Sequence, residues 1–228
     1  MQLSHEELEA LSLNADTLRR AVEAFRTQGF VVLETVLAGA LVDEARETCE
    51  AVLNRKNKNN AVLPYELLRR TPFKELAANP IVLQVVKAVL GDEGAPQGFR
   101  WIRRCPPGGS SIVRVHRDTA GLRDSADDSL PVQLSVDILL TEFTPDNGAT
   151  QIWPGTQHTT EASVEEMKSI RERAEKQPFM QVTGPAGSVS IRDQRAWHRS
   201  GMNRSQEDRM MLSIGDWQSL TALKRDVA

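Results

Sequence analysis

Cysteine is scarce in this chain of 228 residues, which contains only Cys49 and Cys105. Both fall in segments that we assign to different elements, so we expect no disulfide framework and predict a reducing, cytoplasmic location. Long hydrophobic runs are missing too, since no apolar stretch approaches the roughly 20 residues that span a bilayer. The N-terminus also lacks the basic and then apolar layout of a secretion signal. These features argue against disulfide-rich and membrane-spanning classes.

An excess of positive charge is missing as well, because the formal net charge is -3 and the pI is near 5.9. This balance argues against a general partner such as nucleic acid or an anionic membrane. We therefore expect a small-molecule substrate and a monomer or homodimer. Histidine is also rare, and a zinc site made of three histidines would use nearly all of the four present.

The front half of the chain has helical patterning. Apolar residues at helical spacing predict helices over residues 4–28 and 38–55, and Asn79-Pro80 is typical of the start of a third. The compact run Phe30–Leu33 predicts a strand between the first two helices.

After Gly94, short apolar runs replace the helical stripes, with one helical insertion at residues 163–176. The runs are Gly98–Arg103, Ile112–Val115, Val132–Leu140, Ala149–Ile152, Met180–Thr183, Ser188–Ile191 and Arg209–Trp217. Short strands at this spacing predict an antiparallel sandwich or jelly roll covered by helices. We expect an α+β chain with one domain over 1–228, in which 1–95 form the helical front half and 96–220 the jelly-roll core.

Candidate metal ligands lie near two of these runs. Residues two apart on a strand point to the same face, so His116 and Asp118 can aim at one point. His198 from a second strand would complete a set of two imidazoles and one carboxylate, which suits a divalent iron ion with open coordination positions. Arg209 follows eleven residues later, and arginine holds a carboxylate through two parallel hydrogen bonds.

The segment between the two halves of this triad is rich in turn residues. Asn147-Gly148 is a strong hairpin signal, and Thr150 would begin the return strand with its hydroxyl directed into the barrel. His158 follows a second turn, and we interpret it as a structural residue that closes this loop through hydrogen bonds.

Taken together, three motifs resemble the phytanoyl-CoA dioxygenase (PhyH-like) family. They are His116-x-Asp118, the turn Asn147-Gly148-x-Thr150 with Pro154-Gly155-Thr156-x-His158, and His198-x-Ser200-Gly201-x-Asn203-x-Ser205 with Arg209. The motifs cover roughly residues 98–217. The resemblance implies a double-stranded β-helix and dependence on iron(II), 2-oxoglutarate and O2.

Residue by residue, the resemblance implies iron ligands and cosubstrate contacts. The implied ligands, which would also form the catalytic centre, are His116, Asp118 and His198. Arg209 would hold the distal carboxylate of 2-oxoglutarate, helped by Ser200 or Thr150, with Gln133 as a lesser contact. Some family members have glutamine two residues before the first histidine, where this chain has Arg114.

The implied reaction is oxidation of an unactivated C–H bond of a small metabolite, with release of succinate and CO2. Hydroxylation, desaturation and cyclisation are all compatible with it, in secondary-metabolite biosynthesis. Asp118 argues against halogenation, because related halogenases have a small residue at that position. The charges of iron(II), Asp118, 2-oxoglutarate and Arg209 cancel, so this set can be buried without an uncompensated charge.

Substrate residues are less clearly marked. We expect them in Thr119–Pro131 and Asn57–Phe73. Trp101 is a further candidate, together with the basic cluster of Arg100, Arg103 and Arg104. This cluster either faces solvent or recognises a carboxylate or phosphate on the substrate.

Three other functions fit parts of the pattern. The triplet His116-Arg117-Asp118 matches a protein-kinase motif, but Arg123 stands where that motif needs asparagine, and no glycine-rich loop lies near the start. A cupin-like zinc or manganese enzyme that does not use 2-oxoglutarate stays open. So does a non-catalytic β-sandwich that binds its ligand without iron.

Overall fold

A computed structural model describes residues 1–91, 94–96, 100–109, 114–118, 133–159 and 164–219. Among these residues the larger sheet has seven strands, namely β1 Phe30–Leu33, β2 Asn60–Val62, β3 Gly94–Pro96, β4 Arg100–Cys105, β5 Gln133–Leu139, β8 Val189–Asp193 and β10 Arg209–Ser219. Their order is β1-β8-β5-β10-β4-β2, with β3 also paired to β10. The described pairings are antiparallel, and strands far apart in sequence therefore lie side by side in this sheet.

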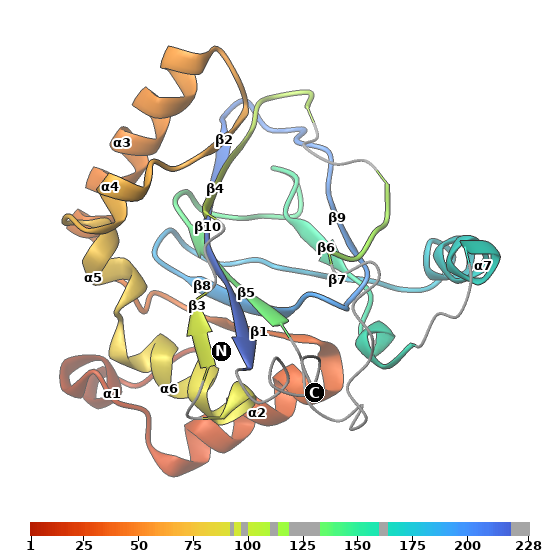
Figure 1. Ribbon diagram of the computed structural model, residues 1–228, viewed down its shortest axis with the longest axis horizontal. Helices are drawn as coiled ribbons and strands as arrows, with labels where there is room; N and C mark the ends of the chain where they lie inside the picture. Colours follow the sequence, from red (N-terminus) through yellow and green to blue (C-terminus); the bar gives the residue numbers. More distant parts are fainter. Residues whose placement is uncertain (92–93, 97–99, 110–113, 119–132, 160–163, 220–228) are drawn as a thin grey trace, which may run out of the picture.

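A second sheet lies on the other side of the larger one from the helices α3–α6 (Figure 1). Its three described strands are β6 Thr150–Ile152, β7 Met180–Gln181 and β9 His198–Ser200, in the order β7-β6-β9. The predicted helix-covered antiparallel jelly roll is thereby confirmed.

The front half supplies the helical layer. Its helices are α1 His5–Ala10, α2 Ala15–Gln28, α3 Gly39–Lys56, α4 Tyr65–Leu68, α5 Phe73–Ala77 and α6 Pro80–Leu90. The helical segment expected over 4–28, in one or two pieces, consists of two helices, because Leu11 adopts a left-handed conformation after α1 and Asn14 caps α2 through the Thr17 amide. Asn79 caps α6 in the same way, and its side-chain oxygen accepts from the Val82 amide.

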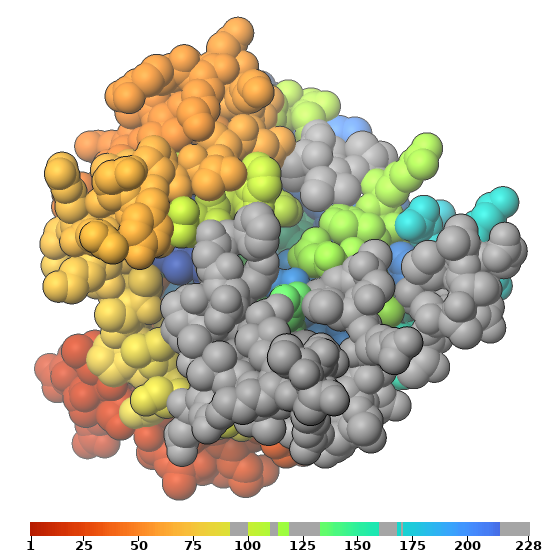
Figure 2. Space-filling view, viewed as in Figure 1, coloured from red at the N-terminus to blue at the C-terminus, as the bar shows by residue number. Residues whose placement is uncertain are grey.

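The rear half contributes α7 Val164–Ala174 and the short 3-10 helix η1 Thr156–His158. In the space-filling view, residues of the front half form one side of the molecule, coloured red to yellow, and α7 lies at the opposite side (Figure 2). None of the described helices is long and apolar enough to span a bilayer.

Two strands of the larger sheet were not expected. β2 pairs with β4 through its backbone while Asn60 and Val62 stay exposed, so it has no hydrophobic pattern. β3 is Gly-Ala-Pro, which has low strand propensity and pairs with the end of β10. Of the expected run Ile112–Val115, positions 112 and 113 lie outside the described residues, and the segment after them forms an isolated bridge between His116 and His198.

The two faces of the larger sheet meet different surroundings. One face buries apolar side chains of β5, β8 and β10 against α2, α3 and α6, and these include Leu134, Ile138, Ile191 and Leu212. Since side chains alternate along a strand, the residues between them point away from the helices, toward the second sheet. The candidate site is on that side.

Candidate metal and cosubstrate site

Backbone pairing brings the three candidate ligands together. The amide of His116 donates to the carbonyl of His198 at 3.0 Å, and the reverse bond is 2.8 Å long. Asp118 lies two residues on, where its amide donates to the Gln194 carbonyl at 3.1 Å. His198 is in β9, opposite Ile152 of β6. The strand-end setting expected for both histidines is therefore present.

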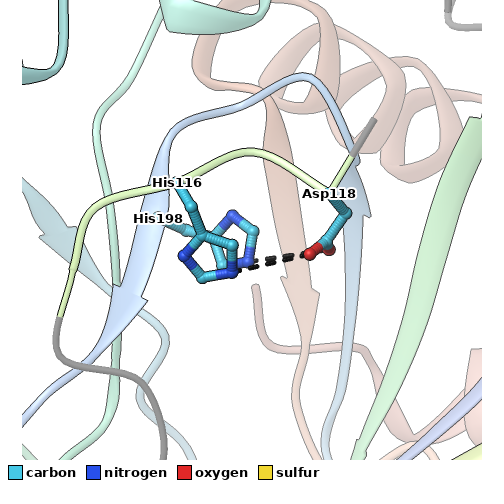
Figure 3. A group of neighbouring side chains, drawn as sticks. All are labelled: His116, Asp118 and His198. Atoms are coloured by element: carbon cyan, nitrogen blue, oxygen red, sulfur yellow. Dashed lines mark ion pairs between the residues drawn. The ribbon is translucent and has the colours of Figure 1, made fainter. Parts of the chain in front are cut away.

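The ligand atoms of His116, Asp118 and His198 lie within 4.8 Å of one another. Each Nε2 atom is 3.6 Å from a carboxylate oxygen of Asp118. The imidazole centroids are 4.3 Å apart, and both rings turn a nitrogen toward the carboxylate (Figure 3). Three donors arranged on one side of a point leave the other side open for further ligands.

The hydrogen bonds of the two imidazoles indicate which nitrogen is free. Nδ1 of His198 lies 3.0 Å from the Ala196 carbonyl, and Nδ1 of His116 lies 3.0 Å from the Arg114 carbonyl. Because a carbonyl only accepts, each Nδ1 carries the proton and each Nε2 keeps its lone pair. Nε2 of His198 is buried and has no hydrogen-bond partner among the described residues. A buried imidazole lone pair beside a carboxylate fits a divalent metal ion.

Electrostatics keep these groups in their ligand forms. Burial and the nearby guanidinium of Arg192 lower the pKa of His198 well below 6.5, so its ring is neutral at neutral pH. Burial alone would raise the pKa of Asp118, but the guanidinium of Arg192 outweighs it and holds the pKa well below its usual range. The Asp118 side chain keeps 28% exposure, so it is accessible to an ion.

Arg209 is a second feature of the site. It starts β10, is 2% exposed, and its guanidinium lies 4.5 Å from the centroid of the Phe143 ring. Its Nη2 donates to Oγ of Ser200 at 2.8 Å, whereas Nε and Nη1 have no hydrogen-bond partner among the described residues. Burial lowers its pKa, yet an arginine stays charged. A buried cation with free N–H groups fits a carboxylate of a bound ligand.

A cavity joins Arg209 to the two histidines of the triad. Its described lining consists of Arg103, His116, Asp137, Thr150, Arg192, His198, Ser200, Arg209 and Met211. The structure thus brings Thr150 and Ser200 together with Arg209 and the histidines. Thr150 of β6 lies opposite Ser200 of β9. Gln133 starts β5 and is not among these lining residues.

The expected substrate residues lie in different places. Arg103 lines the cavity, and Trp101 shares its face of β4 with 36% exposure. Arg104 is on the opposite face, where its guanidinium donates to Asn54 and Asn59. This position argues against a substrate role for Arg104. The expected loop Thr119–Pro131 lies outside the described residues.

Sequence reasoning missed two charged residues of the site, Arg192 of β8 and Asp137 of β5. Arg192 is 4% exposed and donates through Nη2 to Oδ2 of Asp118 at 2.8 Å. Asp137 is 5% exposed and lines the same cavity. A charged residue that alternates with isoleucine or valine inside a strand is the signal that could have found both.

The two glycine-containing motifs pack against each other and support the site. Gly148 has φ +82°, and a Cβ atom there would lie 2.7 Å from the Gly201 carbonyl oxygen. Asn203 is fully buried, and its Nδ2 donates to the carbonyls of Cys105 and Glu207, both at 2.8 Å. These contacts hold together the ends of β4, β9 and β10. Arg209 is the first residue of β10. His158 bonds through Nε2 to the Arg26 carbonyl at 3.0 Å, in keeping with a structural role.

Comparison with known proteins places this geometry in context. The sequence model of the family described as Phytanoyl-CoA dioxygenase (PhyH) matches residues 25–211. Several solved structures share the fold, and the double-stranded β-helix implied above is confirmed.

One of them is the non-heme alpha ketoglutarate dependent carbocyclase SnoK from nogalamycin biosynthesis, with a TM-score of 0.70 and 20% identity over 90% of this chain and 84% of that one. The epimerase SnoN in complex with Fe3+, alpha ketoglutarate and nogalamycin RO has a TM-score of 0.72 and 16% identity over 91% of this chain and 86% of that one. AviO1 from Streptomyces viridochromogenes Tue57 has a TM-score of 0.68 and 20% identity over 89% of this chain and 95% of that one.

Proposed function

The chain belongs to the phytanoyl-CoA dioxygenase (PhyH) family, and from this premise we propose that it oxidises an unactivated C–H bond of a small metabolite. The chain is an iron- and 2-oxoglutarate-dependent oxidoreductase. We propose hydroxylation, desaturation or ring formation in secondary-metabolite biosynthesis as its reaction, with release of succinate and CO2. The carbocyclase and epimerase of nogalamycin biosynthesis support a metabolite substrate, since both share the fold.

The convergence of His116, Asp118 and His198 carries this proposal. Two imidazoles and one carboxylate come from segments some eighty residues apart, and the free Nε2 of His198 has no other described partner. These three residues would hold the iron ion, which supplies O2 activation and the oxidising power when bound. The protein contributes the donor set, its orientation and a cavity that limits water.

Arg209 would bind the distal carboxylate of 2-oxoglutarate. Its free Nη1 and Nε point to such a use, and Ser200 fixes Nη2 at 2.8 Å. A bidentate pair with a buried guanidinium orients a dicarboxylate and balances its charge. Thr150, opposite Ser200, would add a hydroxyl contact.

Among the expected substrate residues, Arg103 is the best-placed candidate for binding the substrate. It lines the cavity on the β4 side, beside the edge where Trp101 is half-exposed. A guanidinium at this position would favour a substrate with a carboxylate or phosphate near the oxidised carbon.

Anaerobic reconstitution with iron(II) and 2-oxoglutarate, followed by a metabolite screen for substrate-stimulated succinate, tests the proposal. We expect one iron per chain and succinate formation that increases with the right metabolite. Iron binding with turnover unaffected by omission of 2-oxoglutarate would instead indicate a cupin-like enzyme, and ligand binding without iron would indicate a binding module.

A further inference from the structure

Arg192 is buried beside the candidate iron ligands and lines the same cavity as Arg209. Its Nη2 donates to Oδ2 of Asp118 at 2.8 Å, and its Nη1 lies 3.3 Å from Nδ1 of His198. Because Nδ1 of His198 already donates to the Ala196 carbonyl, the contact with Nη1 is one of packing rather than a hydrogen bond. The directed bond of Arg192 is therefore the one to Asp118.

Asp137 anchors Arg192 from the other side. Its Oδ2 lies 3.8 Å from Nε of Arg192, and its Oδ1 accepts from the hydroxyls of Ser135 at 2.8 Å and Ser213 at 2.6 Å. Ser135 is directly across from Arg192 in the register of β5 and β8. Two neighbouring strands thus fix Asp137. Its charge compensates the guanidinium across 3.8 Å, without a hydrogen bond to Nε of Arg192.

The charge of Asp137 decides what Arg192 does to a metal ion. An unpaired guanidinium beside Asp118 would repel an incoming cation and compete for the carboxylate. With Asp137 as a second buried anion, the positive charge is compensated and the guanidinium acts as a fixed hydrogen-bond donor. It occupies one oxygen of Asp118, so the carboxylate is held in one orientation. Partners of this kind tune metal affinity by about 10- to 100-fold.

We propose that Arg192, held by Asp137, is a positioning residue that orients Asp118 for iron. The inference rests on the proposed function, because it requires Asp118 to be an iron ligand. Three successive contacts then connect the middle of the larger sheet to the candidate metal site: Ser213 with Asp137, Asp137 with Arg192, and Arg192 with Asp118. No described residue other than Arg192 bonds the Asp118 side chain from this direction.

The test compares iron(II) affinity and the visible absorption of bound cobalt(II) in wild type, Arg192→Lys and the double variant Arg192→Met/Asp137→Asn. The double variant removes both charges of the buried Arg192–Asp137 pair, so loss of the guanidinium does not leave Asp137 as an uncompensated buried carboxylate. We expect its iron(II) Kd to rise at least about tenfold and its cobalt(II) spectrum to change, as Asp118 loses its fixed orientation. Arg192→Lys should restore affinity only in part, because an ammonium lacks the planar fork.

A matched control is the pair Arg195→Met/Asp193→Asn. Arg195 Nη2 lies 2.9 Å from Asp193 Oδ2, and both side chains are buried. We expect this control to lose stability and to keep the wild-type iron Kd and cobalt(II) spectrum. An unchanged or lowered iron Kd in Arg192→Met/Asp137→Asn would overturn the positioning role, while wild-type protein that binds no iron would overturn the proposed function itself.

Discussion

The helix-facing and site-facing sides of the larger sheet are built from the same strands, yet they bury opposite kinds of side chain. Along β10, Leu212 and Ile214 enter the apolar core shared with the helices. On the other face, Arg209 and Met211 line the cavity, and Ser213 donates to Asp137, which lines it too. The first side is stabilised by loss of apolar surface from water, which is insensitive to exact direction. The second depends on directed contacts between charges.

The two buried arginines on the site face differ in their partners. Arg192 lies between Asp118 and Asp137, while Arg209 keeps free N–H groups among the described residues. Burial of a charge is costly unless it is paired, so a free buried guanidinium indicates a place for a ligand anion. One face therefore supplies stability and the other supplies binding. Substitutions on the first should change the free energy of unfolding, and substitutions on the second should change ligand affinity.

The largest effect is expected at the metal ligands. His116→Ala or Asp118→Ala removes one of three donors, so we expect iron binding to be lost while the chain stays folded. Metal analysis after anaerobic loading measures this, with circular dichroism to check the fold. His158→Ala is the matched control, because this histidine bonds to the Arg26 carbonyl outside the triad and should leave iron bound. Stoichiometric iron in both triad variants would contradict the assignment.

The next effect separates cosubstrate from metal. If Arg209 binds 2-oxoglutarate as proposed, Arg209→Ala removes two charge-assisted hydrogen bonds, each worth about 1.5–3 kcal/mol, so we expect the cosubstrate Kd to rise about 100-fold or more. Iron binding should change little. Arg104→Ala is the control, since Arg104 lies beside Met210 on the helix-facing side. A wild-type 2-oxoglutarate Kd in Arg209→Ala, measured by titration calorimetry, would remove its assigned role.

Adjacent residues of β10 test the two faces directly. Leu212→Ala should lower the free energy of unfolding by about 3 kcal/mol, because it leaves a cavity in the core, and should leave iron affinity unchanged. Ser213→Ala loses one hydrogen bond to Asp137, so we expect a loss of only about 1 kcal/mol. Urea denaturation of both variants measures these values. Comparable losses for the two would show that the faces do not differ as described.

Sequence patterns predicted the helices and most strands better than the contacts of the charged residues. Helical stripes and short apolar runs mark these elements, because apolar periodicity is a local property of the sequence. The motif spacing also brought His116, Asp118 and His198 into one hypothesis. Arg192 and Asp137 were missed because each has meaning only through a partner on another strand. The role of Arg104 likewise depends on which face of β4 it occupies.

A smaller effect is expected for the substrate. Arg103→Ala should raise the substrate KM about tenfold if Arg103 pairs with an anionic group, at a cost of about 1.4 kcal/mol. The 2-oxoglutarate Kd should stay near the wild-type value, and Arg104→Ala should leave KM unchanged. Steady-state succinate assays with the identified metabolite measure both. An unchanged KM in Arg103→Ala would discard the anionic-substrate interpretation.

The smallest effect concerns a buried carboxylate in the helical layer, in contrast to the carboxylates of the site. Glu7 accepts from the amide and hydroxyl of Ser4 and from the amide of Asn14, and the Ser4 backbone contact is the main cause that lowers its pKa from 4.5 to about 2. Its partners are backbone groups of a helix cap, so it should affect stability alone. Glu7→Gln should cost about 1 kcal/mol at neutral pH without changing iron affinity.

The pH dependence of that cost gives the sharper result. Because the folded pKa of Glu7 is depressed, its contribution is fully present above the unfolded pKa of 4.5 and is lost as the pH falls toward about 2. Unfolding free energies of wild type and Glu7→Gln should therefore differ at pH 7, and the difference should shrink as the pH is lowered from 4.5 toward about 2. A difference that stays constant over this range would mean that the charge of Glu7 has no part in capping the first helix.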